Sequence, residues 1–141
     1  MHKKSFVFAA AVCCLLAPSA IAGDTTRPSN AQLYIGWPQD GQVITQQPFR
    51  VWFGLRNFGV APAGVEKANT GHHHLIINSP LPAADEEIPN DKNHRHFGAG
   101  QSEVMLELPP GRHTLQLVMG DHNHVPHDPP LVSRRITITV K

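Results

Sequence analysis

The chain has 141 residues, and its 12 Lys and Arg against 11 Asp and Glu give a net charge of +1 with histidine neutral. A balance this close to neutrality lacks the basic excess typical of proteins that bind nucleic acid or anionic membranes. The length suits a single domain. The unusual feature of the composition is ten histidines.

The N-terminal segment has the layout of a secretory signal peptide. It reads MHKKSFVFAAAVCCLLAPSAIAGD, with two lysines, an apolar run over residues 6–16 and the small-residue frame Ala20-Ile21-Ala22. We expect residues 1–22 to be cleaved and the mature protein to be periplasmic or secreted. The apolar run is shorter than the roughly 20 residues that cross a bilayer, so we expect no membrane span in the mature chain.

Both cysteines, Cys13 and Cys14, lie in this expected signal segment. The residues before them, Val12 and Cys13, are not the small residues of a lipoprotein site, which disfavours lipidation. The mature chain then has no disulfide and no thiolate ligand. Loss of the two N-terminal lysines leaves ten basic against eleven acidic residues, a net charge of −1. We expect residues 23–30 to form a flexible lead and residues 31–141 to form one domain.

The rest of the chain alternates apolar and polar residues with a period of two. This pattern is typical of antiparallel strands with one buried face. It recurs in five segments punctuated by Pro, Gly and Asp: 33–37, 49–55, 104–108, 113–119 and 136–140. No segment has a convincing helical period. We predict an all-β fold, an immunoglobulin-like antiparallel β-sandwich of six to seven strands without a disulfide.

The segment 78–92 departs from the alternation. It reads NSPLPAADEEIPNDK, with three prolines and four acidic residues. Proline excludes it from a central strand, and we expect a long surface loop. Loops of this length are often functional, although a solvated connector is an equal alternative.

The nine histidines beyond residue 22 fall into three groups and one single residue. The groups lie in GHHHL at 71–75, NHRH at 93–96 and HNHVPH at 122–127, and His113 stands alone. Side chains two residues apart in a strand point the same way, roughly 6.5–7 Å from each other. A sandwich brings strand ends and loops together at one pole, so these groups can converge.

The clustering predicts a metal site. Its principal candidate ligands are His72, His74, His94, His96, His124 and His127, and its secondary candidates are His73, His113 and His122. His73 falls on the face of Leu75 and Ile77, although the phase at a strand start leaves the reverse assignment open. His113 alternates with two leucines and is expected to face the core. Imidazole ligands without thiolate favour copper or zinc, whereas calcium needs six to eight oxygens.

Three functions are compatible with these residues. The first is a periplasmic protein that binds copper or zinc for storage, delivery or tolerance, with the metal ion and a second envelope protein as candidate partners. The second is a metalloenzyme, which needs about three ligands and an open position. The third is a metal-free immunoglobulin-like interaction or structural module of the cell envelope. We rank metal binding first, the metal-free module second and a metalloenzyme third.

The enzyme hypothesis has little support from motifs. The H-E-x-x-H zinc motif and the G-x-S-x-G elbow are absent. A histidine-brace copper site needs histidine as the first mature residue, but the mature chain is expected to begin at Gly23. Several acidic residues could act as a general base, namely Glu86, Glu87, Asp91, Asp121 and Asp128. Nothing in their spacing singles one out, so no catalytic residue is assigned.

The chain resembles a family of small exported bacterial proteins grouped as a domain of unknown function. The resemblance rests on TGHHHLIIN, NHRHFGAGQ, LPPGRHTLQLVMGDHNHVPHDPP and RRITITV, and it spans about residues 33–140. It implies an exported immunoglobulin-like β domain without a settled activity. The family motifs include the histidines that match His73, His74, His94, His96, His113, His124 and His127. The resemblance implies that His122 is an addition in this chain. It also makes His113 a stronger candidate member of the histidine site.

Overall fold

The computed structural model describes residues 25–141, so the expected signal segment lies outside the described residues. No helix in this range is long and apolar enough to cross a membrane. Nine strands run through it in chain order: β1 (Gln32–Trp37), β2 (Val43–Ile44), β3 (Phe49–Arg56), β4 (Gly59–Val60), β5 (Thr70–Ile77), β6 (His94–His96), β7 (Glu103–Leu106), β8 (Gly111–Gly120) and β9 (Ile136–Val140).

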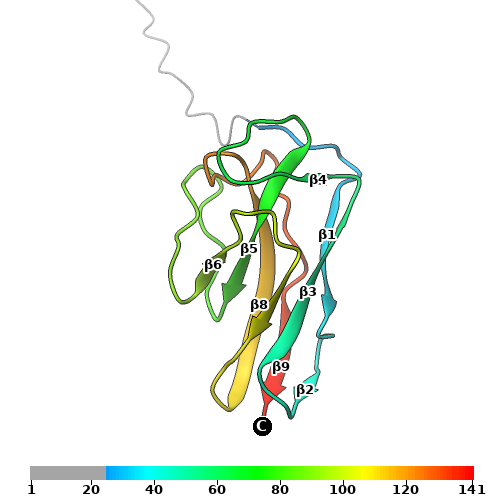
Figure 1. Ribbon diagram of the computed structural model, residues 1–141, viewed down its shortest axis with the longest axis vertical. Coiled ribbons are helices and arrows are strands. Elements are labelled where there is room, and N and C mark those ends of the chain that lie inside the picture. Colours follow the sequence, from blue (N-terminus) through cyan, green and yellow to red (C-terminus); the bar gives the residue numbers. More distant parts are fainter. Residues whose placement is uncertain (1–24) are drawn as a thin grey trace, which may run out of the picture.

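The strands form two sheets that lie one against the other (Figure 1). One sheet has the order β1-β3-β7, and the other has the order β2-β9-β8-β5-β4, with β6 paired to β5. This arrangement confirms the predicted all-β sandwich. Six strands have four or more residues, which agrees with the expected number. The short strands β2 and β4 pair in parallel with β9 and β5, unlike the antiparallel pairing expected throughout.

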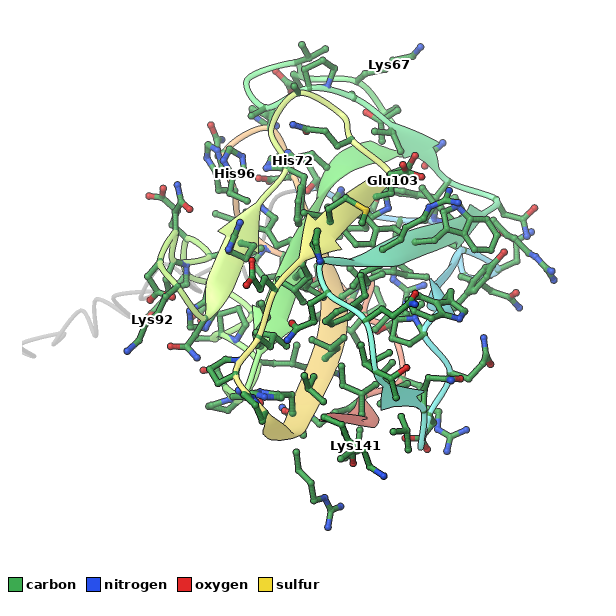
Figure 2. All side chains as sticks on the ribbon, turned by 60° about the horizontal axis from the view of Figure 1, so that its bottom comes forward. Lys67, His72, Lys92, His96, Glu103 and Lys141 are labelled. Carbon is green, nitrogen blue, oxygen red and sulfur yellow. The ribbon has the colours of Figure 1, made fainter. Side chains whose placement is uncertain are left out.

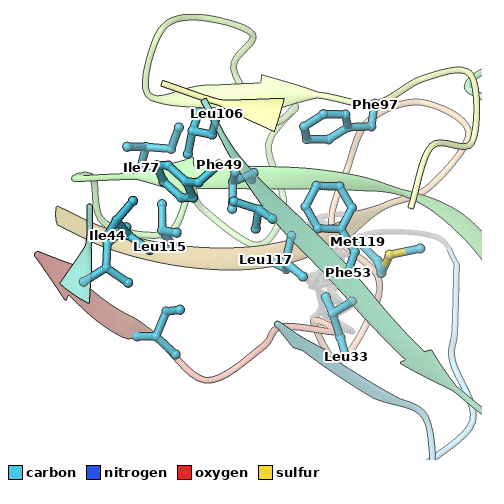
Figure 3. Close-up of a cluster of buried hydrophobic side chains, with 14 of the residues drawn as sticks. Leu33, Ile44, Phe49, Phe53, Ile77, Phe97, Leu106, Leu115, Leu117 and Met119 are labelled. Atoms are coloured by element: carbon cyan, nitrogen blue, oxygen red, sulfur yellow. The ribbon is translucent and has the colours of Figure 1, made fainter. Parts of the chain in front are cut away.

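The main core fills the space between the two sheets (Figure 3). Alternate residues of β3, such as Val51 and Phe53, belong to the same buried cluster as Leu115 and Leu117 of β8. These four side chains are at most 3% exposed. Burial of one such apolar side chain contributes roughly 1.5–3 kcal/mol, so this core is the main stabilising element of a domain whose described residues include no cysteine.

Strand β5 is buried on both of its faces. Its alternation sends Leu75 and Ile77 into the main core. Ile76, on the opposite face, joins a second apolar cluster with Val118 of β8 and with Ile88. Ile88 belongs to the proline-rich connection between β5 and β6, so this predicted loop covers part of the outer face of the six-stranded sheet.

The first described residues lie along the segment that follows β8. Thr26 forms a parallel bridge with Asp128, and the hydroxyl of Thr25 donates a hydrogen bond to Asp121 at 3.1 Å. Arg27 donates to the carbonyl of Pro129 at 2.8 Å. This part of the expected lead is therefore bonded to the domain close to the third histidine group.

Candidate metal centre

Three histidines meet on the outer face of the six-stranded sheet, where β5 lies beside β6. His72 and His74 share this face because they are two residues apart in β5. His96 of β6 pairs directly with His74 across the antiparallel ladder. Side chains that face each other across two strands have Cβ atoms about 4.5–5.5 Å apart, so the register alone brings the imidazoles together.

The ring geometry of these three residues is compact. The Nε2 atoms of His72 and His74 lie 3.0 Å apart. The ring of His96 has its centroid 5.0 Å from that of His72 and 5.0 Å from that of His74. Each residue offers one nitrogen such that the three nitrogens lie within 4.8 Å of one another. Figure 2 labels His72 and His96, whose side chains come from neighbouring strands on the same side of the sheet.

A fourth imidazole, that of His124, approaches from the turn after β8. Its ring centroid lies 4.8 Å from that of His96, 5.0 Å from that of His72 and 6.1 Å from that of His74. Asp121 shapes the turn, because its Oδ1 accepts hydrogen bonds from the backbone N–H groups of Asn123 and Val125 at 2.8 and 3.0 Å. Two strands and one turn thus supply the four rings.

Two glycines leave room for these rings. Gly120 pairs with His72 across the β5–β8 ladder, and a Cβ atom there would lie 2.8 Å from Nε2 of His74. A Cβ atom on Gly98 would lie 2.6 Å from Nε2 of His96. Both distances are shorter than side chains tolerate, so a larger residue at either position would displace an imidazole of the cluster.

Burial keeps the clustered histidines neutral. His72 and His74 are fully buried, with 0% exposure. Desolvation, followed by the neighbouring imidazoles of His96 and His124, lowers the pKa of His72 to about 4. Desolvation and the imidazole of His72 lower the pKa of His74 to about 2. Burial also lowers the pKa of His96. At neutral pH these rings are unprotonated, which is the form that binds a metal.

The cluster leaves buried nitrogens without protein partners. Within residues 25–141, no hydrogen-bond partner lies near Nδ1 of His72, Nδ1 of His74 or Nε2 of His96. A buried polar atom without a partner costs roughly 1–3 kcal/mol. The two Nε2 atoms, 3.0 Å apart, are at hydrogen-bond distance, so one ring donates to the other. The same separation fits two ligands of one metal ion, because two nitrogens at about 2.0–2.1 Å from the ion lie roughly 2.9–3.4 Å apart. The three residues therefore form a group that can hold a metal ion.

His94 lies on the same face of β6 but is bonded elsewhere. Its Nδ1 donates to Oδ1 of Asp91 at 2.9 Å, and its Nε2 lies 3.4 Å from the hydroxyl of Ser79. The contact with His94 is the largest cause of a lowered pKa at Asp91. The structure thus separates the predicted His94–His96 pair, with only His96 in the cluster.

His73 and His127 lie apart from the cluster. Nδ1 of His73 donates to the carbonyl of Gln101 at 3.0 Å, and its ring packs 5.1 Å from that of Phe53. This places His73 on the core side, as the alternation predicted. Nε2 of His127 donates to the carbonyl of Thr70 at 3.1 Å, and its ring lies edge-on to Phe58. Burial lowers the pKa of both histidines.

The two remaining candidates are also bonded away from the cluster. Nε2 of His113 donates to the carbonyl of Pro109 at 2.7 Å, and its Nδ1 accepts from the amide of Asn78 at 2.8 Å. His122 contacts the side chain of the adjacent Asn123 at 3.0 Å. Four of the nine candidate histidines therefore meet at one place, and five do not.

The glycines that make space for the rings were missed by the sequence-based prediction. Gly98 and Gly120 stand directly beside histidine motifs, in HFG and GDH. A strand or strand end that carries glycine next to a large side chain often marks a close approach, so a local signal for them exists. No sequence pattern predicts the contact between Glu87 and His124. The carboxylate of Glu87 lies 4.0 Å from Nδ1 of His124 only because the folded loop brings it there.

The fold and the cluster define a β-sandwich with a histidine centre on the outer face of its larger sheet. The chain belongs to a family described as a domain of unknown function, DUF4399, whose model matches residues 51–141. This match confirms the predicted membership in a family without a known function, and it includes all four clustered histidines. No curated protein and no solved structure shows significant similarity to the chain.

Proposed function

We propose that this domain binds one divalent transition-metal ion, copper or zinc, through His72, His74 and His96. The observation that carries the proposal is the 3.0 Å separation of two fully buried Nε2 atoms, with a third imidazole paired across the strand ladder. Burial keeps these imidazoles unprotonated, and an unprotonated ring nitrogen has the lone pair that binds a metal cation. A core of apolar residues at these positions would be easier to fold without a ligand.

The donor set supports copper or zinc over other ions. All three ligands are imidazole nitrogens, which suit Cu and Zn, whereas Ca and Mg take oxygen ligands. Cys13 and Cys14 are the only cysteines of the sequence, so residues 25–141 contain no thiolate. The signal-like N-terminus supports a periplasmic or secreted location. There the domain would store, deliver or buffer the metal.

The test uses two variants of one strand. His96→Gln removes a ring of the cluster, and His94→Gln removes a ring two residues away that is bonded to Asp91. Equilibrium dialysis of the mature protein against Zn(II) or Cu(II), with elemental analysis, should find about one ion per chain. His96→Gln should weaken binding by roughly 100-fold or more, since it removes a ligand outright, and His94→Gln should match the wild type.

A ligand that binds only the folded state must raise the melting temperature. Wild-type protein that binds neither metal, and that melts at the same temperature with and without metal, would contradict the proposal. The domain would then be a metal-free module of the cell envelope, with its histidines serving only its packing.

A further inference from the structure

The turn that carries His124 holds this residue in an uncommon backbone conformation. Its φ is +67°, in the left-handed region that residues other than glycine rarely adopt. Such conformations are strained and persist where the surroundings impose them. Here the N–H of His124 donates to the carbonyl of Asp121 at 3.0 Å. The result is a ring centroid within 5.0 Å of those of both His72 and His96.

The orientation of the His124 ring separates the roles of its two nitrogens. Nδ1 lies 4.0 Å from Oε1 of Glu87, so this nitrogen faces the carboxylate. Nε2, the other ring nitrogen, is the candidate ligand atom of His124, whose ring lies beside the three-histidine group. Metal-ligating histidines commonly direct their other nitrogen to a carboxylate, which fixes the ring and increases its basicity. Glu87 approaches His124 from a different loop, and its 4.0 Å separation from Nδ1 is longer than a hydrogen bond but within reach of one after a small side-chain movement.

The loop that carries Glu87 is attached to the same turn. The N–H of Ile88 donates to the carbonyl of His124 at 2.8 Å. The side chain of Ile88 is 2% exposed and packs in the outer apolar cluster with Ile76 and Val118. The neighbouring acids remain in solvent, and the side chain of Glu87 is 74% exposed. The loop thus covers the outer face while it presents a carboxylate to His124.

We propose that His124 is a fourth ligand that closes the coordination shell, and that Glu87 and the β5–β6 loop hold it in place and slow the exit of the metal. This inference rests on the proposed function of the three-histidine group. Four imidazoles fill a tetrahedral shell, whereas a catalytic site keeps one position open. A closed shell of this kind serves binding and delivery, and release requires the loop and turn to separate.

The experiment compares four forms of the mature protein loaded with Co(II), whose visible spectrum reports coordination number. The forms are the wild type, His124→Gln, Glu87→Gln and, as the matched control, Glu86→Gln in the same exposed loop. The wild type should show a tetrahedral spectrum that added azide leaves unchanged. His124→Gln should still bind one ion, with affinity lower by roughly 10–100-fold, and azide should change its spectrum.

The loop's contribution is measured by the rate of metal loss to an excess of chelator. Glu87→Gln should lose metal about tenfold faster than the wild type, and Glu86→Gln at the wild-type rate. The inference is overturned if azide changes the wild-type spectrum as much as that of His124→Gln, since the site is then open. It is also overturned if Glu87→Gln and Glu86→Gln lose metal equally fast. If the wild type binds no metal at all, the result contradicts the proposed metal-binding function itself.

Discussion

His74 and His96 face each other across the ladder between β5 and β6. This single register position joins the first two histidine groups of the sequence. It also places both rings on the outer face of the sheet, away from the core that Leu75 and Ile77 enter. The position of the site therefore follows from the pairing of β5 with β6.

The space above Gly98 is needed for the position of His96. We expect Gly98→Ala to weaken metal binding by at least tenfold, because the new Cβ atom would lie 2.6 Å from Nε2 of His96. The exposed neighbour Ala99 provides the control, and Ala99→Ser should bind like the wild type. Isothermal titration calorimetry with Zn(II) measures both affinities. Equal affinities in the two variants would show that the ring of His96 does not bind the metal from this position.

The metal-free protein should lose stability as the pH falls below about 6.5. Burial lowers the pKa of His72 and His73 from 6.5 to about 4. Between these pH values the unfolded chain therefore binds protons that the folded chain does not bind. The stability is fully present above pH 6.5 and declines as the pH falls toward 4. One such group contributes on the order of 3 kcal/mol over this window. Urea denaturation with chelator present, at pH 7.5, 6 and 5, measures the decline.

His73→Leu tests the core histidine separately from the four-histidine cluster. His73 packs against Phe53 on the inner face, so the variant should keep one metal ion per chain with an affinity within about threefold of wild type. Its stability should depend less on pH, because one buried titrating group is gone. Leucine leaves the carbonyl of Gln101 without this hydrogen bond, at a cost of about 1 kcal/mol. Loss of the metal in this variant would place His73 in the coordination shell after all.

The main core should be independent of the metal centre. Leu117 is fully buried between the sheets, and Leu117→Ala should lower the free energy of unfolding by about 2–5 kcal/mol through lost burial and a cavity. Met105 is 57% exposed, so Met105→Ala should change the free energy of unfolding by less than about 0.5 kcal/mol. Thermal denaturation gives both values. At a temperature where Leu117→Ala is folded, it should still bind one ion, and a loss of binding there would contradict this independence.

The sequence predicted the elements that depend on local periodicity. The alternation in β5 correctly placed His73 on the side of Leu75 and Ile77, and it put His72 and His74 together on the other side. Which of His94 and His96 meets them depends on the β5–β6 register, and no local pattern sets that register. The hydrogen bond from His94 to Asp91, three residues earlier, did have a local cue in the turn sequence NDKNH.

The third histidine group shows where sequence reasoning ends. His124 and His127 are equally plausible ligands by spacing. The left-handed backbone of His124 directs its ring to the cluster, whereas His127 donates to the carbonyl of Thr70. The hydrogen bonds of Asp121 within this turn are local, but the bond from Ile88 of the β5–β6 loop to the carbonyl of His124 is a tertiary contact that no local pattern predicts. The contact of Glu87 with His124 has the same origin, because it joins residues of two loops.

X-ray absorption spectroscopy of the zinc- or copper-loaded protein tests the proposed metal centre most directly. We predict a first shell of nitrogen at about 2.0–2.1 Å, with the outer-shell scattering of at least three imidazoles and no sulfur. His96→Gln should reduce the imidazole count, and His94→Gln should leave it unchanged. A shell made mostly of oxygen, or one with a single imidazole in the wild type, would contradict a metal centre built from His72, His74 and His96.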